Sequence, residues 1–215
     1  MIDRERGAAY AKHALAGYAA ARVAVLAASY RPRCALLGEE RAYLELSERA
    51  ARWTGVVGER MRAALHRALG TPIEEAAVLR FGCILERPPL SVGRMTMIGH
   101  YAHIQHASIG ADCLIGDHVL MFDGRDQHHF DRLDIPINAQ GGIVTQVRVG
   151  DDCLVGGRAI IMADVGDHCV VAAGSVVTAP VAPYGIVAGN PARAIGDRRE
   201  RRARPGLGAR RGAQA

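Results

Sequence analysis

The stretch Asp126-Gln127-His128-His129-Phe130-Asp131 places two adjacent histidines between carboxylates. A neutral imidazole, with a pKa of about 6.5, can accept a proton and return it near neutral pH. Imidazoles and carboxylates are also metal ligands, and the same residues are ordinary in a solvated loop. The surrounding sequence has to decide between a general base, a metal site and a polar loop.

From about residue 84 the chain repeats with a period of six, an aliphatic residue being followed mostly by glycine. Such a repeat predicts short strands, tight turns and coils that stack into a mainly β, parallel solenoid with one aliphatic ladder as its core. The register slips by one residue before Ile109 and lacks two residues after Ile161. The ladder positions are Val92, Ile98, Ile104, Ile109, Ile115, Val149, Val155, Ile161, Val165, Val171 and Val177.

Three of the five cysteines, Cys113, Cys153 and Cys169, occupy the fifth position of a repeat, where other repeats carry Thr, Ala or Ser. We therefore expect them to be small buried residues and neither ligands nor nucleophiles. The cysteines form no CxxC pair and their number is odd. This usage disfavours a secreted disulfide framework and favours a reducing, cytoplasmic compartment.

Residues 1–75 are rich in Ala, Arg, Glu and Leu and predict a helical segment, with helices at 3–29, 39–52 and 58–70. In the last helix Met61, Leu65 and Leu69 form an apolar stripe. The sequence shows no secretory signal and no uncharged apolar run long enough for a transmembrane span. This segment either caps the open end of the solenoid or forms an acceptor pocket.

Residues 197–215 carry seven arginines against Asp197 and Glu200, so this tail accounts for the whole formal net charge of +5. With no apolar periodicity it predicts a disordered, Arg-rich tail that aids solubility. A contact with nucleic acid or an anionic membrane is the alternative. Nucleic acid is the weaker partner because no aromatic residue interleaves the arginines.

The hexads, the ending "AAGSVVT…VAGNPAR" and a His-bearing excursion between coils together resemble the left-handed parallel β-helix (hexapeptide-repeat) acyltransferases. The resemblance covers 84–196 and is closest to the sugar, polysaccharide and xenobiotic O-acetyltransferases. It implies a left-handed coil and a homotrimer whose active sites lie between neighbouring solenoids. It also implies acetyl-CoA as acyl donor, a saccharide or small-molecule acceptor, and no metal.

The excursion, residues 122–146, interrupts the repeat between Met121 and Val147. In the related enzymes a loop here carries a histidine that acts as general base, two residues before an aromatic and upstream of a proline. His128, with Phe130 and Pro136, matches that form, and His129 one residue later is the alternative. Asp126, or else Asp123 or Asp131, could fix the tautomer, and Asn138 and Gln140 could hydrogen-bond a polyhydroxylated acceptor.

The resemblance also implies a set of contacts with CoA. Gly157 and Ala173 match positions whose backbone lies along the pantetheine arm, with tight packing as the alternative reason for their size. Thr178 and Arg193 match positions near the phosphates and adenine, where an Arg offers a forked set of donors.

The chain departs from the family pattern in three places. Leu154 stands where Trp is frequent, the coil after Ile161 is shortened, and "GHYAHIQHA" replaces an early Asn-containing motif. The spacing of His100, His103 and His106 does not favour a shared metal site. No two histidines show the HxxxxH spacing of γ-type carbonic anhydrases, which need three His ligands on zinc. A serine acetyltransferase-like enzyme, an N-acetyltransferase and a non-catalytic scaffold stay as alternatives.

Overall fold

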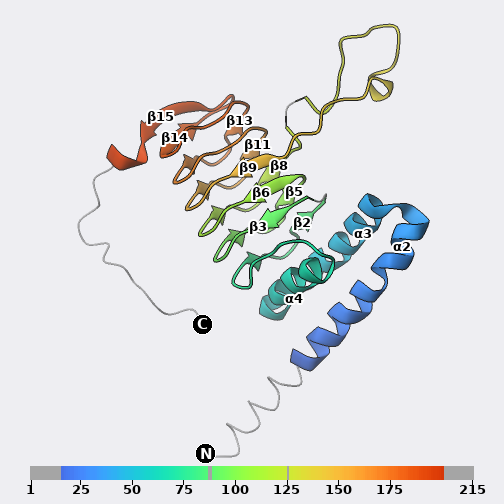
Figure 1. Ribbon diagram of the computed structural model, residues 1–215. Helices are drawn as coiled ribbons and strands as arrows, with labels where there is room; N and C mark the ends of the chain where they lie inside the picture. The colour runs from blue at the N-terminus through green and yellow to red at the C-terminus, as the bar shows by residue number, and fades with distance from the viewer. Residues whose placement is uncertain (1–15, 87–88, 125, 201–215) are drawn as a thin grey trace, which may run out of the picture.

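The computed structural model describes residues 16–86, 89–124 and 126–200. Figure 1 shows a stack of parallel coils, a layer of helices beside the first coil, and one long loop that leaves the stack. The parallel solenoid predicted from the repeat is confirmed, whereas its left-handed sense stays a prediction.

The coils are built mostly from two- and three-residue strands arranged in three sheets, while the last two strands, β14 and β15, have four and five residues. Sheet I has the order β1-β4-β7-β10-β12-β14-β15, sheet II β13-β11-β8-β5-β2, and sheet III β3-β6-β9. Every pairing is parallel except that between β14 and β15. The strands are β1 Val78–Leu79, β2 Ile84–Leu85, β3 Ser91–Val92, β4 Met97–Ile98, β5 His103–Ile104, β6 Ala107–Ile109, β7 Leu114–Ile115, β8 Leu120–Met121, β9 Val147–Val149, β10 Leu154–Val155, β11 Ile160–Ile161, β12 Val170–Val171, β13 Val176–Val177, β14 Gly185–Ala188 and β15 Arg193–Asp197.

In almost every strand the last residue points into the solenoid and is buried. The aliphatic ladder expected from the hexads is this core, and its members, including Val92, Ile104 and Val177, are at most 2% exposed. One turn runs from Met97 to Leu114 and another from Leu154 to Val170. Both fall short of three full hexads because of the one-residue slip and the two-residue deletion seen in the sequence.

The solenoid begins earlier than the predicted residue 84. Ile73 already bridges to Val92 in parallel, and β1 pairs with β4. The first coil escapes the repeat pattern because Glu74, Glu75 and Ala76 stand where later coils have Gly and small residues.

The N-terminal segment is helical, as predicted, over residues 16–28, α2 (Tyr30–Leu37), α3 (Glu39–Ala51) and α4 (Gly55–Ala68). The short α2 was not expected as a separate helix, and the predicted positions 3–15 lie outside the described residues. Ser47 Oγ of α3 accepts a hydrogen bond of 2.9 Å from the backbone N–H of Leu85, and Arg62 Nε of α4 donates one of 2.9 Å to Leu79 O. The helices therefore lie directly on the first coil. Among the described residues, no helix combines the length and hydropathy needed to cross a bilayer.

Candidate active site

The excursion loop, residues 122–146, leaves the corner between sheets II and III, after β8 and before β9. In Figure 1 it projects away from the stack as a narrow arm. Backbone hydrogen bonds join the two sides of its base, from Thr145 N to Asp123 O at 2.8 Å and from Ile143 N to Asp126 O at 2.8 Å. The break in the repeat thus marks a built structure that carries the histidines away from the core.

The tip of the arm is held by its own side chains. The Gln140 amide donates to Arg132 O at 2.7 Å and accepts from Arg132 N at 3.0 Å. Arg132 also forms an ion pair with Asp134. Asn138 lies in the 3-10 turn Ile137–Ala139 and is exposed. Gln140 therefore has a loop-stabilising role in the isolated chain, and acceptor contacts by Gln140 and Asn138 stay predictions.

The two candidate bases differ in exposure. His128 is exposed and His129 is partly exposed, and the His129 N–H donates to Gly141 O at 2.9 Å. Within the described part of the chain, neither imidazole has a hydrogen-bond partner. Close beside them, Gly142 packs so tightly on the Gln127 carbonyl that an added Cβ would lie 1.7 Å from its oxygen. The arm fixes the backbone around the histidines and leaves their rings open to a ligand.

A polar network at the base of the arm was not expected from the sequence. Gln127 Nε2 donates to Gln105 Oε1 at 3.0 Å, and Gln105 Nε2 donates to Glu86 Oε2 at 3.0 Å. The same carboxylate oxygen lies 2.7 Å from His103 Nε2. His103 is the one polar residue among the outward-facing positions of sheet II that begin β2, β5, β8, β11 and β13. In the sequence, the departure from the family pattern at "GHYAHIQHA" marks this region as unusual. Only the stacking of the coils shows that His103 and Gln105 of this segment contact Glu86 and Gln127.

Asp123 is almost fully buried, at 4% exposure, and sits where the arm begins. Its Oδ1 accepts a hydrogen bond of 2.9 Å from the His106 N–H of the coil below. This bond anchors the start of the arm to the coil below. Asp126 and Asp131 are exposed.

A groove of about 430 Å³ lies between the base of the arm and the upper coils at the corner of sheets II and III. Asp126 and Gly124 line it from the arm, and Thr178 and Met162 line it from the coils. The loop leaves from the same corner at which β11 and β13 end, so stacking brings the segments together. The structure thus joins one expected catalytic residue, Asp126, and one expected CoA contact, Thr178, in a single groove.

The other corner of sheet II, where sheet I turns into sheet II, holds Gly157 and Ala173 on neighbouring coils. Gly174 N donates to Gly157 O at 3.0 Å, and a Cβ on Gly157 would lie 3.2 Å from Asp117 O. On Gly156 it would lie 2.4 Å from Ala173 N. Ala173 itself is exposed. Small residues are therefore required here by coil-to-coil packing, and they leave a flat strip of backbone at the surface.

Arg193 begins β15 in the topmost layer and is exposed. It pairs with Ala188, and the neighbouring Ala192 N donates to Val176 O at 2.8 Å, so the "GNPAR" segment crosses the top of the same corner. Arg193 Nη1 donates to Ala192 O at 3.0 Å, which leaves most of its guanidinium donors free for an anion. Gly157, Ala173 and Arg193 thus follow one edge of the solenoid.

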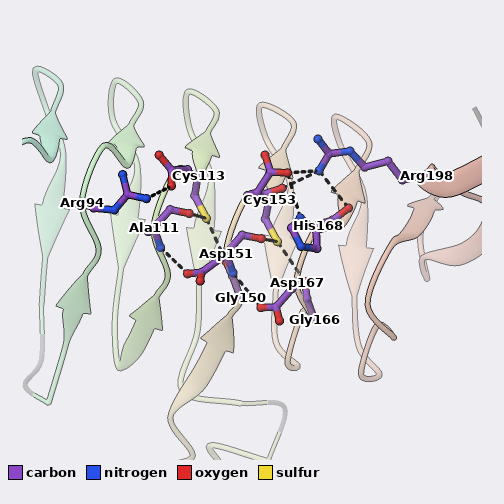
Figure 2. Close-up of polar contacts among 12 residues, drawn as sticks. Arg94, Ala111, Cys113, Gly150, Asp151, Cys153, Gly166, Asp167, His168 and Arg198 are labelled. Atoms are coloured by element: carbon purple, nitrogen blue, oxygen red, sulfur yellow. Dashed lines mark hydrogen bonds and ion pairs between the residues drawn. The ribbon is translucent and has the colours of Figure 1, made fainter. Parts of the chain in front are cut away.

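At the third corner, between sheets III and I, side chains join neighbouring coils through polar contacts (Figure 2). Cys113 Sγ and Cys153 Sγ donate to the carbonyls of Gly150 and Gly166 at 3.0 and 3.1 Å, and Asp151 Oδ1 accepts from Ala111 N at 2.7 Å. Burial raises the pKa of the Cys169 thiol. The expectation that these cysteines are small buried residues is confirmed, since all three are at most 2% exposed.

The start of the predicted disordered tail is ordered instead. Asp197 ends β15, and Arg198 donates to Asp152 O at 2.8 Å while pairing with its carboxylate at 2.8 Å (Figure 2). His168 Nδ1 lies 3.0 Å from the same carboxylate. The hydrogen bonds from His168 and Arg198 hold the pKa of Asp152 below its usual range. Composition missed this anchor because the partners come from other coils; residues 201–215 lie outside the described residues.

The three histidines considered for a metal do not share a partner. His100 lies 3.2 Å from Asp117 Oδ1 and His103 lies 2.7 Å from Glu86 Oε2. His106 donates its backbone N–H to Asp123, and the buried nitrogens of its imidazole have no hydrogen-bond partner among the described residues. Among the described residues, no three His, Cys, Asp or Glu side chains come together in a way that could hold a metal ion.

Comparison with known proteins agrees with this architecture. A model of the hexapeptide repeat of succinyl-transferases matches residues 146–179. A search of curated protein sequences gave no match. A hexapeptide-repeat acetyltransferase from Vibrio cholerae is 25% identical, with a TM-score of 0.61 over 74% of this chain and 93% of that one.

Two more distant structures share the fold. A maltose O-acetyltransferase from Clostridium difficile 630 is 22% identical, with a TM-score of 0.54 over 75% of this chain and 88% of that one. An N-acyltransferase from Bacillus cereus, solved with dTDP and 3-hydroxybutyryl-CoA, is 18% identical, with a TM-score of 0.51 over 60% of this chain and 71% of that one. The resemblance to hexapeptide-repeat acyltransferases is therefore confirmed.

Proposed function

We propose that this hexapeptide-repeat chain is a CoA-dependent acyltransferase that moves an acetyl group from acetyl-CoA to a hydroxyl of a sugar, polysaccharide or natural-product acceptor. The observation that carries the proposal is the groove that Asp126 of the arm and Thr178 of the upper coils line together. It brings the histidine-bearing arm beside Thr178, one of the predicted CoA contacts, while Gly157, Ala173 and Arg193 follow the other corner of sheet II.

The reaction needs a base because the acceptor hydroxyl must lose its proton as its oxygen attacks the thioester carbonyl. The imidazole of His128, or of His129, takes that proton. The carbon–sulfur bond then breaks, and the imidazolium returns the proton to the CoA thiolate, so charge and atoms balance. Asp126, which lines the groove from the arm, is the carboxylate proposed to orient the imidazolium.

The edge formed by Gly157, Ala173 and Arg193 fits an extended acyl-CoA. Gly157 has no side chain and Ala173 has a small, exposed one, so the backbone at both positions is accessible to the pantetheine arm. The free guanidinium donors of Arg193 suit a phosphate. Thr178, the other predicted contact near the phosphates and adenine, is partly exposed in the groove at the opposite corner of sheet II.

The arm is proposed to complete its active site against a second copy, in a homotrimer. Isolated, it exposes several large apolar side chains, with Leu133 98% and Phe130 70% exposed. Exposed apolar side chains gathered on one segment are typical of a surface that contacts another protein chain. The other exposed members are Ile137, Ile143 and Val144.

The test is release of the CoA thiol from acetyl-CoA, screened over sugars and over small hydroxyl- or amine-bearing acceptors. We expect His128→Ala to lower kcat by about 10²–10⁴-fold while CoA still protects the protein against thermal unfolding. His168→Asn is the matched control, because His168 lies at the third corner and Asn tolerates its left-handed backbone, φ 60°.

If His129→Ala lowers kcat and His128→Ala does not, the general base is His129. Turnover with amines alone makes the chain an N-acyltransferase, as the Bacillus cereus neighbour is named. If acetyl-CoA is neither bound nor cleaved, the chain is a scaffold with the fold of the family and the proposed function is wrong.

A further inference from the structure

A second cavity lies far from the groove, in the helical segment. It is an open, groove-shaped cavity of about 850 Å³ bounded by the helical residues 16–28, the end of α3 and the start of α4. This volume falls within the range of about 300–1,000 Å³ that is usual for small-molecule sites. Its walls are mainly apolar, including Val25, Met61 and the ring of Trp53. Val25 is 74% exposed, so the apolar lining is accessible from solvent.

The charged residues that line this cavity are basic. Arg22, Arg49 and Arg52 line it, and among the described residues no Asp or Glu does. Arg49 is neutralised by Glu45, whose Oε1 accepts from its Nη2 at 2.6 Å. Arg52, by contrast, has no ion-pair partner among the described residues.

Arg22 has an unusual position in the cavity wall. Its guanidinium carbon lies 5.6 Å from the ring centroid of Tyr18 and 5.7 Å from that of Trp53. Contact with two aromatic faces holds the cation at the border between the apolar wall and the opening. Arg22 and Arg52 therefore present two positive groups at the mouth of an apolar pocket, and neither forms an ion pair with a carboxylate in the part of the chain that the structure describes.

We propose that this cavity binds a single-chain amphipathic anion, an alkyl chain that ends in a phosphate or a carboxylate. The chain would occupy the apolar walls and the head group would contact Arg22 and Arg52. Apolar burial and charge complementarity then act on the same molecule, so neither half alone would bind comparably. The proposal is independent of the acyl-transfer reaction.

The cavity contains its own reporter, because Trp53 is the only tryptophan of the protein and is 8% exposed. Titration with dodecyl phosphate, kept below its micelle-forming concentration, is expected to give a saturable change in Trp fluorescence. Dodecanoate should act similarly. Inorganic phosphate and dodecanol, which carry only the head group or only the chain, should each bind at least about tenfold more weakly.

Two variants separate the contributions. Arg52→Gln is expected to weaken dodecyl phosphate by about tenfold or more, the scale of one charge-assisted hydrogen bond, and to leave the weak binding of dodecanol unchanged. Val57→Glu places a carboxylate in the lining and should abolish binding of the anion. Arg60→Gln, an exposed position on α4 that does not line the cavity, is the matched control.

Dodecanol that binds as tightly as dodecyl phosphate would show an apolar patch only and overturn the proposal. It would also be overturned if no ligand changed the Trp53 signal in the full-length protein, or if Arg60→Gln weakened binding as much as Arg52→Gln. Because the readout is binding, a failed acyltransferase assay leaves this result unaffected.

Discussion

Gln127 Nε2 donates a hydrogen bond of 3.0 Å to Gln105 Oε1, and this bond ties the residue before His128 to the solenoid. Gln105 in turn donates to Glu86, which also meets His103. The arm is therefore attached to two lower coils through side chains as well as to its own base through the backbone. This attachment fixes the position of the segment that carries His128 and His129.

Gln127→Ala and Gln105→Ala are each expected to lower kcat by up to about tenfold, because one neutral side-chain hydrogen bond contributes about 0.5–1.5 kcal/mol. The Kd of CoA should not change, since neither residue lies at the CoA edge. Steady-state kinetics with calorimetric CoA binding check this. The double variant should lose no more than either single one; additive losses would show that the bond does not position the arm.

Ala173→Trp is expected to weaken CoA binding by about tenfold or more without lowering the melting temperature. Ala173 is exposed, so the larger side chain covers the strip of backbone proposed for the pantetheine arm and leaves the core intact. Calorimetric titration with CoA measures the effect. Ala182→Trp, at a site that is also exposed and lies at the third corner, is the control; equal weakening by both variants would contradict the assignment of the edge.

Gly156→Ala is expected to lower the free energy of unfolding by about 1–3 kcal/mol, the usual cost of overpacking a core. Its Cβ would lie 2.4 Å from Ala173 N of the next coil, where only backbone can give way. Gly17→Ala is the matched control, because its Cβ meets nothing within 4 Å in a helix, and it should stabilise by up to about 1 kcal/mol. Urea unfolding of both variants decides the sign of each effect.

His66 predicts a pH dependence of stability in the helical segment. Burial lowers its pKa from 6.5 to about 3, and its Nδ1 lies 2.7 Å from the hydroxyl of Tyr43. The folded state therefore holds His66 neutral, while the unfolded chain binds a proton below pH 6.5. The stability that His66 contributes is complete above pH 6.5 and is lost as the pH falls toward 3, by about 1.4 kcal/mol per pH unit.

The measurement is urea unfolding of wild type and His66→Gln between pH 7.5 and 5, over which carboxylate effects cancel in the difference. We expect wild type to lose more stability than the variant as the pH falls. A difference that stays constant over this range would mean that His66 binds a proton equally well in the folded and unfolded protein, and would contradict the lowered pKa.

The sequence by itself determined the repeat, the buried ladder and the position of the arm. An aliphatic residue every six positions can be buried only if the coils stack, so the repeat predicts which residue of each hexad lies in the core. The same periodicity showed that Cys113, Cys153 and Cys169 are core residues. His128 and His129 were found because their segment breaks the pattern that surrounds it.

Only the tertiary structure decided which residues meet across coils. The network of Glu86, His103 and Gln105 with Gln127, the anchoring of Arg198 on Asp152, and the groove shared by Asp126 and Thr178 all join residues of different coils. Outward-facing side chains carry no burial signal, and their neighbours depend on the register set by coil length. The slip before Ile109, the deletion after Ile161 and the arm change that register, so these contacts follow from the stacked coils and not from local sequence.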